Sequence, residues 1–167
     1  LAKGNQVMGL FEPSHMQYEL DRAGDRAGEP SLADLTETAI KRLSQDKDGY
    51  VLMVEGGRID HAHHAGNAAR ALADALAFDE AVARAKDMTD EADTLIIVTA
   101  DHSHTLSISG YAERGNPILG LSQSEGELAL GEDGKPYTTL GYMNGPGAIC
   151  PGSDSVDDLL EGGARDK

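Results

Sequence analysis

Residues 50–64, which read YVLMVEGGRIDHAHH, are the most informative stretch of this sequence for its fold. The run from Tyr50 to Val54 is apolar and rich in β-forming residues, which predicts a short buried strand, and Glu55 directly follows it. Asp60 and His64 are four residues apart, so one helical turn would place both on the same face. The glycines at positions 56 and 57 allow a tight turn between the two elements.

A second stretch, TLIIVTADHSH at residues 94–104, repeats this arrangement. Thr94 to Thr99 is the clearest predicted strand of the chain, and Asp101 and His102 follow it. The two stretches together hold three carboxylates and five histidines, with no cysteine. Carboxylate oxygen and imidazole nitrogen suit zinc, and carboxylate-rich positions suit magnesium. This ligand set is typical of an open catalytic metal site.

Helices are predicted next to both strands. Ser31 to Gln45 has an N-cap serine and one apolar face, and Ala68 to Met88 is alanine-rich with leucines at helical spacing. Helix–strand–helix–strand order predicts an α/β fold with parallel strands joined by right-handed crossovers. The residues before Ser31 are predicted to be mostly loop. Residues 110–150 are predicted to be loop-rich, and short strands are expected at Thr105–Ser109 and Tyr137–Tyr142.

The composition narrows the classes of partner. The net charge is −15, from 29 acidic and 14 basic residues, which disfavours nucleic-acid binding. An ordinary acidic surface and an adaptation to a salty environment both fit this charge. No apolar run approaches membrane-spanning length, so we expect no membrane span. The single cysteine, Cys150, excludes a disulfide within the chain.

The two polar clusters are predicted to form one site. Ligands of open α/β sheets bind beyond the carboxyl ends of the strands, and neighbouring parallel strands would bring the clusters within roughly 5–10 Å. Each residue alone is more often a surface or packed side chain, but five at two matching strand ends are hard to obtain by accident. The predicted metal ligands are Glu55, Asp60, His64, Asp101 and His102. His15 and His63 are assigned to no metal, since His15 stands alone and a helix would point His63 away from Asp60 and His64.

These residues resemble the alkaline phosphatases, and the animal-type branch most closely. The resemblance runs from about Val7 to Gly147. Besides the two metal motifs, four further segments resemble family segments in the family's order. They are Gly9–Pro13, Phe78–Val82, Gly110–Tyr111 with Arg114–Asn116, and Asn144–Gly147.

The resemblance implies two zinc ions, one magnesium ion and a serine nucleophile, in an α/β/α sandwich around a mostly parallel sheet. It implies that Glu55 binds magnesium, that Asp60 and His64 bind the first zinc, and that Asp101 and His102 bind the second. His61 would reach the phosphate or the magnesium shell through water, which makes it the catalytic candidate. His104 would orient the carboxylate of Asp60. Two zinc ions about 4 Å apart suit an in-line phosphoryl transfer.

A calcium site is also implied, with the Phe11 carbonyl, Glu12 and Glu29 as ligands, and oxygen-only ligation suits calcium. A short insertion near Glu29 departs from the family's spacing, so a plain surface acid is the alternative there. The family's serine nucleophile and a terminal zinc-binding histidine match nothing in residues 1–167. We therefore expect this sequence to be a central-to-C-terminal part of one catalytic domain.

The predicted function of the parent protein is metal-dependent hydrolysis of phosphate monoesters, and the isolated fragment is expected to be inactive. The resemblance further implies a homodimer in the periplasm or outside the cell. A phosphomutase or sulfatase of the same superfamily is one alternative, against which the string GGRIDHAHH speaks. A non-catalytic metal-binding module is the other.

Overall fold

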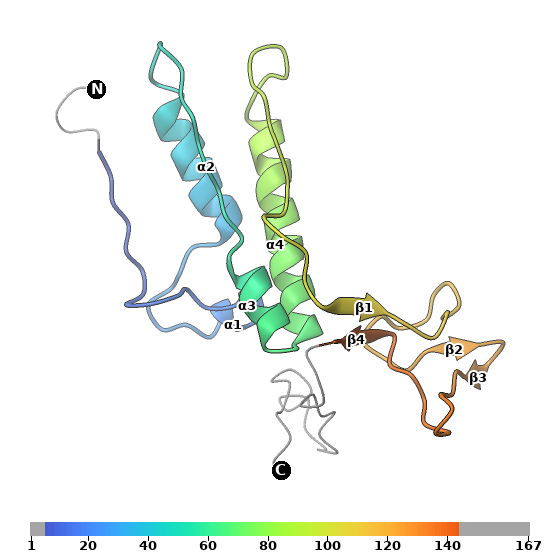
Figure 1. Cartoon of the computed structure of the whole chain (residues 1–167). Coiled ribbons are helices and arrows are strands. Elements are labelled where there is room, and N and C mark those ends of the chain that lie inside the picture. Colours follow the sequence, from blue (N-terminus) through green and yellow to red (C-terminus); the bar gives the residue numbers. More distant parts are fainter. Residues whose placement is uncertain (1–5, 144–167) are drawn as a thin grey trace. The chain divides into compact units, whose positions relative to one another are not determined.

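A computed structural model describes residues 6–143 of the chain (Figure 1). The described residues divide into two compact units. The first contains the residues up to Ile59 together with Leu72–Asp101, and the second contains Asp60–Ala71 and the residues from His102 onward. The predicted family segment Asn144–Gly147 and Cys150 lie outside the described residues. Among the described helices, none is both long and apolar enough to cross a membrane.

The first unit is built on helices. Helix α1 spans Glu19–Arg22, α2 spans Leu32–Leu43, and most of the long helix α4, Ala68–Asp87, belongs here. The predicted helices at 31–45 and 68–88 are confirmed within one or two residues at each end. The prediction that the residues before Ser31 are mostly loop is confirmed for residues 6–30, in which α1 is a single turn.

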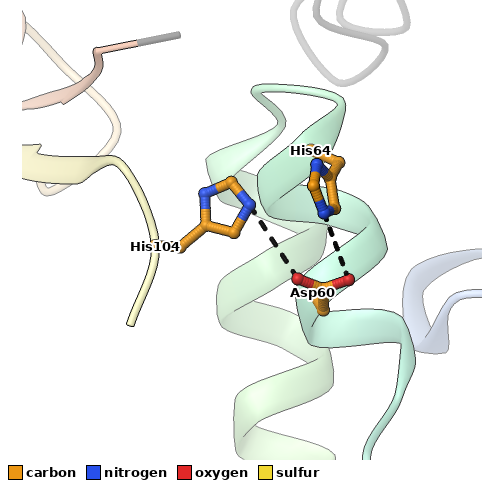
Figure 2. A group of neighbouring side chains, drawn as sticks. All are labelled: Asp60, His64 and His104. Atoms are coloured by element: carbon orange, nitrogen blue, oxygen red, sulfur yellow. Dashed lines mark ion pairs between the residues drawn. The ribbon is translucent and has the colours of Figure 1, made fainter. Parts of the chain in front are cut away.

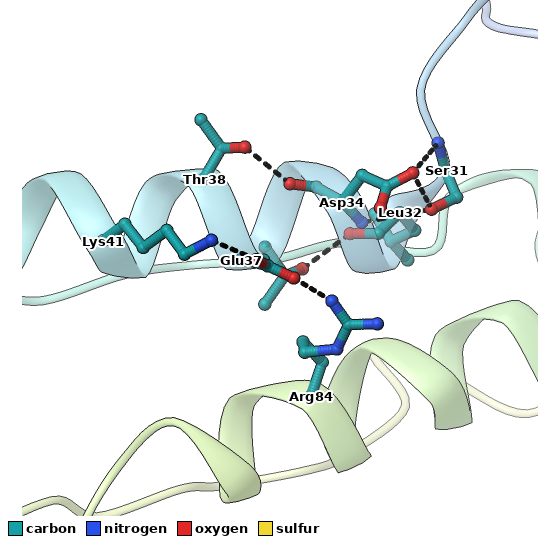
Figure 3. Close-up of polar contacts among 8 residues, drawn as sticks. Ser31, Leu32, Asp34, Glu37, Thr38, Lys41 and Arg84 are labelled. Carbon is teal, nitrogen blue, oxygen red and sulfur yellow. Dashed lines mark hydrogen bonds and ion pairs between the residues drawn. The ribbon is translucent and has the colours of Figure 1, made fainter.

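Helix α2 begins where the sequence predicts, because Ser31 and Asp34 form a reciprocal capping box at its N-terminus (Figure 3). The Ser31 Oγ accepts a hydrogen bond from the Asp34 N–H at 3.1 Å, and the Asp34 carboxylate accepts one from the Ser31 N–H at 3.4 Å. The hydrogen bonds from Ser31 lower the pKa of the Asp34 carboxyl below its ordinary value. Farther along α2, Glu37 pairs with Lys41 and with Arg84 of α4, which ties the two helices together.

The two predicted parallel strands are not formed. Residues 50–54 and 94–99 have no regular secondary structure, and the described strand pairs are all antiparallel. Leu52 and Val54 are partly buried, whereas Val51 is 95% and Met53 is 86% exposed. This alternation has the period of a strand, but a strand also needs a neighbour to bond its backbone groups. Within residues 6–143 neither segment meets one, so the described residues do not form the predicted parallel sheet.

The second unit contains helix α3, Arg58–His64, except for its first two residues, and two short ladders. Strand β1, Leu106–Ile108, pairs with β4, Leu140–Tyr142, so the short strands predicted in both places are confirmed. Strands β2, Gln123–Ser124, and β3, Glu127–Leu128, form a hairpin.

The side chain of Asn116 organises the loop-rich part of this unit. Its Nδ2 donates to the Thr139 Oγ1 at 2.9 Å and to the Leu121 carbonyl at 3.1 Å, and its Oδ1 accepts from the Gln123 N–H at 3.1 Å. These bonds hold together residues that a loop would otherwise leave to solvent. The ladder between β1 and β4 starts two residues after His104, so this framework also fixes the position of the second histidine cluster.

Candidate metal centre

Helix α3 places the first pair of predicted ligands on one face. The helix begins after Gly56 and Gly57 and ends at His64, and Gly66, whose φ of 67° suits glycine, lets the chain turn into α4. Within it, the His64 Nε2 lies 3.5 Å from the Asp60 Oδ2. The prediction that one helical turn brings these two side chains together is therefore confirmed.

The carboxylate of Asp60 is the centre of a histidine cluster (Figure 2). While its Oδ2 faces His64, its Oδ1 lies 3.9 Å from the His104 Nε2. The same Oδ1 lies 3.7 Å from the His102 Nε2. The Oδ1 atom is buried and has no hydrogen-bond partner. A buried carboxylate oxygen with neighbouring imidazole nitrogens just beyond hydrogen-bond distance fits a cation, which would satisfy both kinds of atom.

The backbone assigns different tautomers to His102 and His104. The His102 Nδ1 lies 2.8 Å from the Ser103 carbonyl oxygen, which can only accept, so Nδ1 carries the proton and Nε2 keeps its lone pair. The His104 Nδ1 accepts from the Thr105 N–H at 2.8 Å, so in the neutral ring the proton is on Nε2. His102 therefore presents a ligand atom toward Asp60, whereas His104 presents a donor.

This difference separates metal ligands from an orienting residue. By distance alone, Asp60, His64 and His104 form a group whose candidate ligand atoms lie within 4.8 Å of one another. The tautomer indicates that His104 instead directs its Nε2–H toward the Asp60 carboxylate. Metal-ligating groups usually have such a neighbour, which orients them. The burial agrees, because the His104 side chain is 13% exposed whereas that of His64 is 69% exposed and open to an incoming ion.

The structure does not test the roles of the other predicted site residues. Glu55 and Asp101 are exposed and belong to the first compact unit, so their convergence with Asp60 stays a prediction. The Glu55 carboxylate lies over Gly57, where a Cβ would be 3.3 Å from its Oε1. His61 is partly buried on α3.

The predicted calcium ligands are tested only in part. Glu29 is buried rather than a plain surface acid, and its Oε2 accepts from the Gln17 N–H at 2.8 Å. Its Oε1 is buried without a hydrogen-bond partner. Glu12 is partly buried, and Phe11 is 42% exposed. A buried carboxylate oxygen without a partner is compatible with a cation at Glu29, whereas the convergence of the three residues stays a prediction.

The structure adds two residues that the sequence reasoning did not assign. The His63 Nδ1 and the Tyr142 hydroxyl share a hydrogen bond of 2.8 Å, and the His63 ring stacks on that of His104. Burial, and then the neighbouring His104, lowers the pKa of His63, which favours the neutral ring. Local spacing could not reveal this pair, because 79 residues separate its members.

Comparison with known proteins gives a consistent result. A family model described as alkaline phosphatase matches residues 2–160. The chain is 50% identical over 148 residues to the tissue-nonspecific alkaline phosphatase isozyme of Felis catus, covering 89% of the chain and 27% of that protein. It is 46% identical over 145 residues to an alkaline phosphatase of Gadus morhua, covering 87% of the chain and 29% of that protein. The chain thus spans about a quarter of the length of the curated relatives it matches.

Proposed function

The chain belongs to the alkaline phosphatase family, and from that premise we propose that it supplies metal ligands to a phosphomonoesterase. The reaction is hydrolysis of a phosphate monoester to an alcohol and phosphate. The observation that carries the proposal is the Asp60 carboxylate with its partnerless buried Oδ1, facing three histidine side chains. Carboxylate and imidazole ligands favour zinc over calcium in that place.

We propose that Asp60 and His64 bind one zinc ion, and that His102 and Asp101 bind a second. The contact of the His102 Nδ1 with the Ser103 carbonyl, which directs Nε2 toward the Asp60 carboxylate at 3.7 Å, supports its part in this assignment. Glu55 is proposed as a magnesium ligand, on the strength of its carboxylate and its place in the motif. When bound, two zinc ions stabilise negative charge on the attacking and leaving oxygens of a phosphoryl transfer.

The residues of this chain then have separable tasks. Asp60 and His64 offer ligand atoms from one rigid helical turn, so little side-chain freedom is lost when an ion binds. His104 faces the Asp60 Oδ1 with its Nε2 at 3.9 Å and is proposed to orient the carboxylate for the ion. His61 is proposed to contact the phosphate or the magnesium shell through water, as the family resemblance implies.

The experiment is a phosphatase assay on the intact natural protein that carries this sequence, with p-nitrophenyl phosphate as substrate. We expect activity with zinc and magnesium, loss on chelation, and recovery when zinc is returned. Asp60→Asn, which keeps the size of the side chain and removes its charge, should lose both zinc and activity. Activity that survives both chelation and Asp60→Asn would contradict the proposal.

A non-catalytic metal-binding role is the alternative for the isolated 167-residue chain, because the chain spans only about a quarter of its relatives. Metal analysis and the same assay on that isolated chain test it. We expect zinc uptake without turnover above a metal-only control. Zinc-dependent turnover that Asp101→Ala abolishes would show that the chain contains a nucleophile of its own.

Three further features of the parent protein are proposals that the family resemblance motivates. We propose a calcium ion at Glu29, with Glu12 and the Phe11 carbonyl as companions, which the partnerless Glu29 Oε1 supports. We also propose a homodimer located in the periplasm or outside the cell. Calcium analysis of Glu29→Gln, light scattering and cell fractionation test these in turn.

A further inference from the structure

The bond between His63 and Tyr142 closes a triangle of three chain segments in the second unit. The first side is the 2.8 Å hydrogen bond between helix α3 and strand β4. The second is the β1–β4 ladder, in which Tyr142 pairs with Leu106 and the Met143 N–H donates to the Thr105 carbonyl at 3.0 Å. The third runs from His104 back to Asp60 on α3. Each segment is therefore fixed against the other two.

His104 lies inside this triangle between two rings of α3. The His63 ring stacks on it, with centroids 5.3 Å apart and planes 25° from parallel, and His64 meets it edge-on at 4.7 Å. The ring of His104 is nearly buried, so its orientation depends on these neighbours. The stacked ring of His63 would be free to turn about its own side-chain bonds if nothing fixed it.

The hydrogen bond with the Tyr142 hydroxyl limits this rotation. A hydrogen bond to one ring nitrogen restricts the rotation of an imidazole. Tyr142 is itself partly buried and belongs to a paired strand, so the bond does not swing with a loose loop.

We propose that Tyr142 is a positioning residue of the metal centre. Its hydroxyl holds the His63 ring, and the stacked His63 ring in turn keeps the Nε2–H of His104 directed at Asp60. This inference rests on the proposed function, in which Asp60 binds zinc. Neither Tyr142 nor His63 contacts the ion in this arrangement. They act on the metal ligand Asp60 only through His104.

The test measures metal binding in the intact natural protein with two probes, zinc alone and cobalt alone. Zinc affinity is measured by competition with a chromophoric chelator, and cobalt reports ligand geometry through its visible spectrum. Tyr142→Phe should weaken zinc binding about 3- to 10-fold, the effect of one lost hydrogen bond, and should change the cobalt spectrum. His63→Phe, which keeps a stacked ring without Nδ1, should give the same change.

The double variant should be no worse than either single variant, because both partners of one bond are then removed together. Tyr137→Phe is the matched control, since it makes the same chemical change on a tyrosine outside the cluster, and it should match the unmodified protein. Melting temperatures of the metal-free proteins show whether a variant merely loses stability.

Unchanged zinc affinity and an unchanged cobalt spectrum in Tyr142→Phe, with zinc bound normally by the unmodified protein, would overturn this inference alone. A melting temperature that falls without either metal signal changing would also overturn it, in favour of plain packing. An unmodified protein that binds no zinc would instead overturn the proposed function, and this inference with it.

Discussion

Replacing His104 with alanine tests whether this histidine binds the metal or orients a ligand. The Nε2–H of His104 faces the Asp60 Oδ1 at 3.9 Å, and the His104 side chain is 13% exposed. Removing a neighbour that orients a metal ligand usually weakens metal binding by about 10- to 100-fold. Because the Asp60 side chain is 35% exposed, solvent screening favours the lower half of that range. We expect His104→Ala to weaken zinc binding by about 10- to 30-fold and to keep the full zinc content at saturation.

Two further variants distinguish an orienting residue from a metal ligand. His104→Gln can place an amide N–H near the position of the imidazole Nε2–H, so it should recover most of the lost affinity. His102→Ala should lower the zinc content by one ion per chain, since it removes a ligand atom rather than an orienting donor. The measurements are elemental analysis after dialysis and zinc titration of the intact protein. Equal loss of bound zinc in His104→Ala and His102→Ala would refute the reasoning from the tautomers.

Three further predictions concern stability. Ser31→Ala should lower the free energy of unfolding by about 1 kcal/mol in denaturant titrations, because it removes one half of the α2 cap, and an unchanged midpoint would contradict this. Burial raises the pKa of Asp74 above its ordinary 3.8, so the folded protein holds this proton more tightly than the unfolded chain. The stabilisation from this proton is present at low pH and is lost as the pH rises through the folded-state pKa of Asp74. The melting temperature of Asp74→Asn should therefore fall less than that of the unmodified protein over the same pH range. With a net charge of −15, the melting temperature should rise between about 0.05 M and 1 M sodium chloride at saturating metal, and a flat response would indicate an ordinary acidic surface.

The local features of this chain could be predicted from its sequence because neighbours along the chain produce them. The cap of α2 needs only Ser31 and Asp34, three residues apart, and the facing of Asp60 and His64 needs only one helical turn. The motif strings also identify the family, since they carry ligands and spacing together. The ladder of β1 with β4 was likewise predicted as two short strands, although not as a pair.

The strand-like runs at 50–54 and 94–99 show the limit of such reasoning. Their composition and alternation favour a buried strand, and Val51 and Leu95 are instead 95% and 82% exposed. A strand is stabilised by the backbone of another strand, which no local pattern can supply. Periodicity therefore indicates what a segment is suited to, and only the neighbouring chain decides whether it forms.

For the candidate metal centre, the sequence determined which residue types are available and which two share a helical face. The folded structure added the conformation of the local backbone and the contacts between distant segments. His102 and His104 are two positions apart in one motif, yet the local backbone turns the carbonyl of Ser103 toward one ring and the N–H of Thr105 toward the other, which favours opposite tautomers. The contact of His63 with Tyr142 joins residues 79 positions apart. The physical reason is that a hydrogen bond depends on where atoms meet in space, whereas the sequence fixes only which atoms are covalent neighbours.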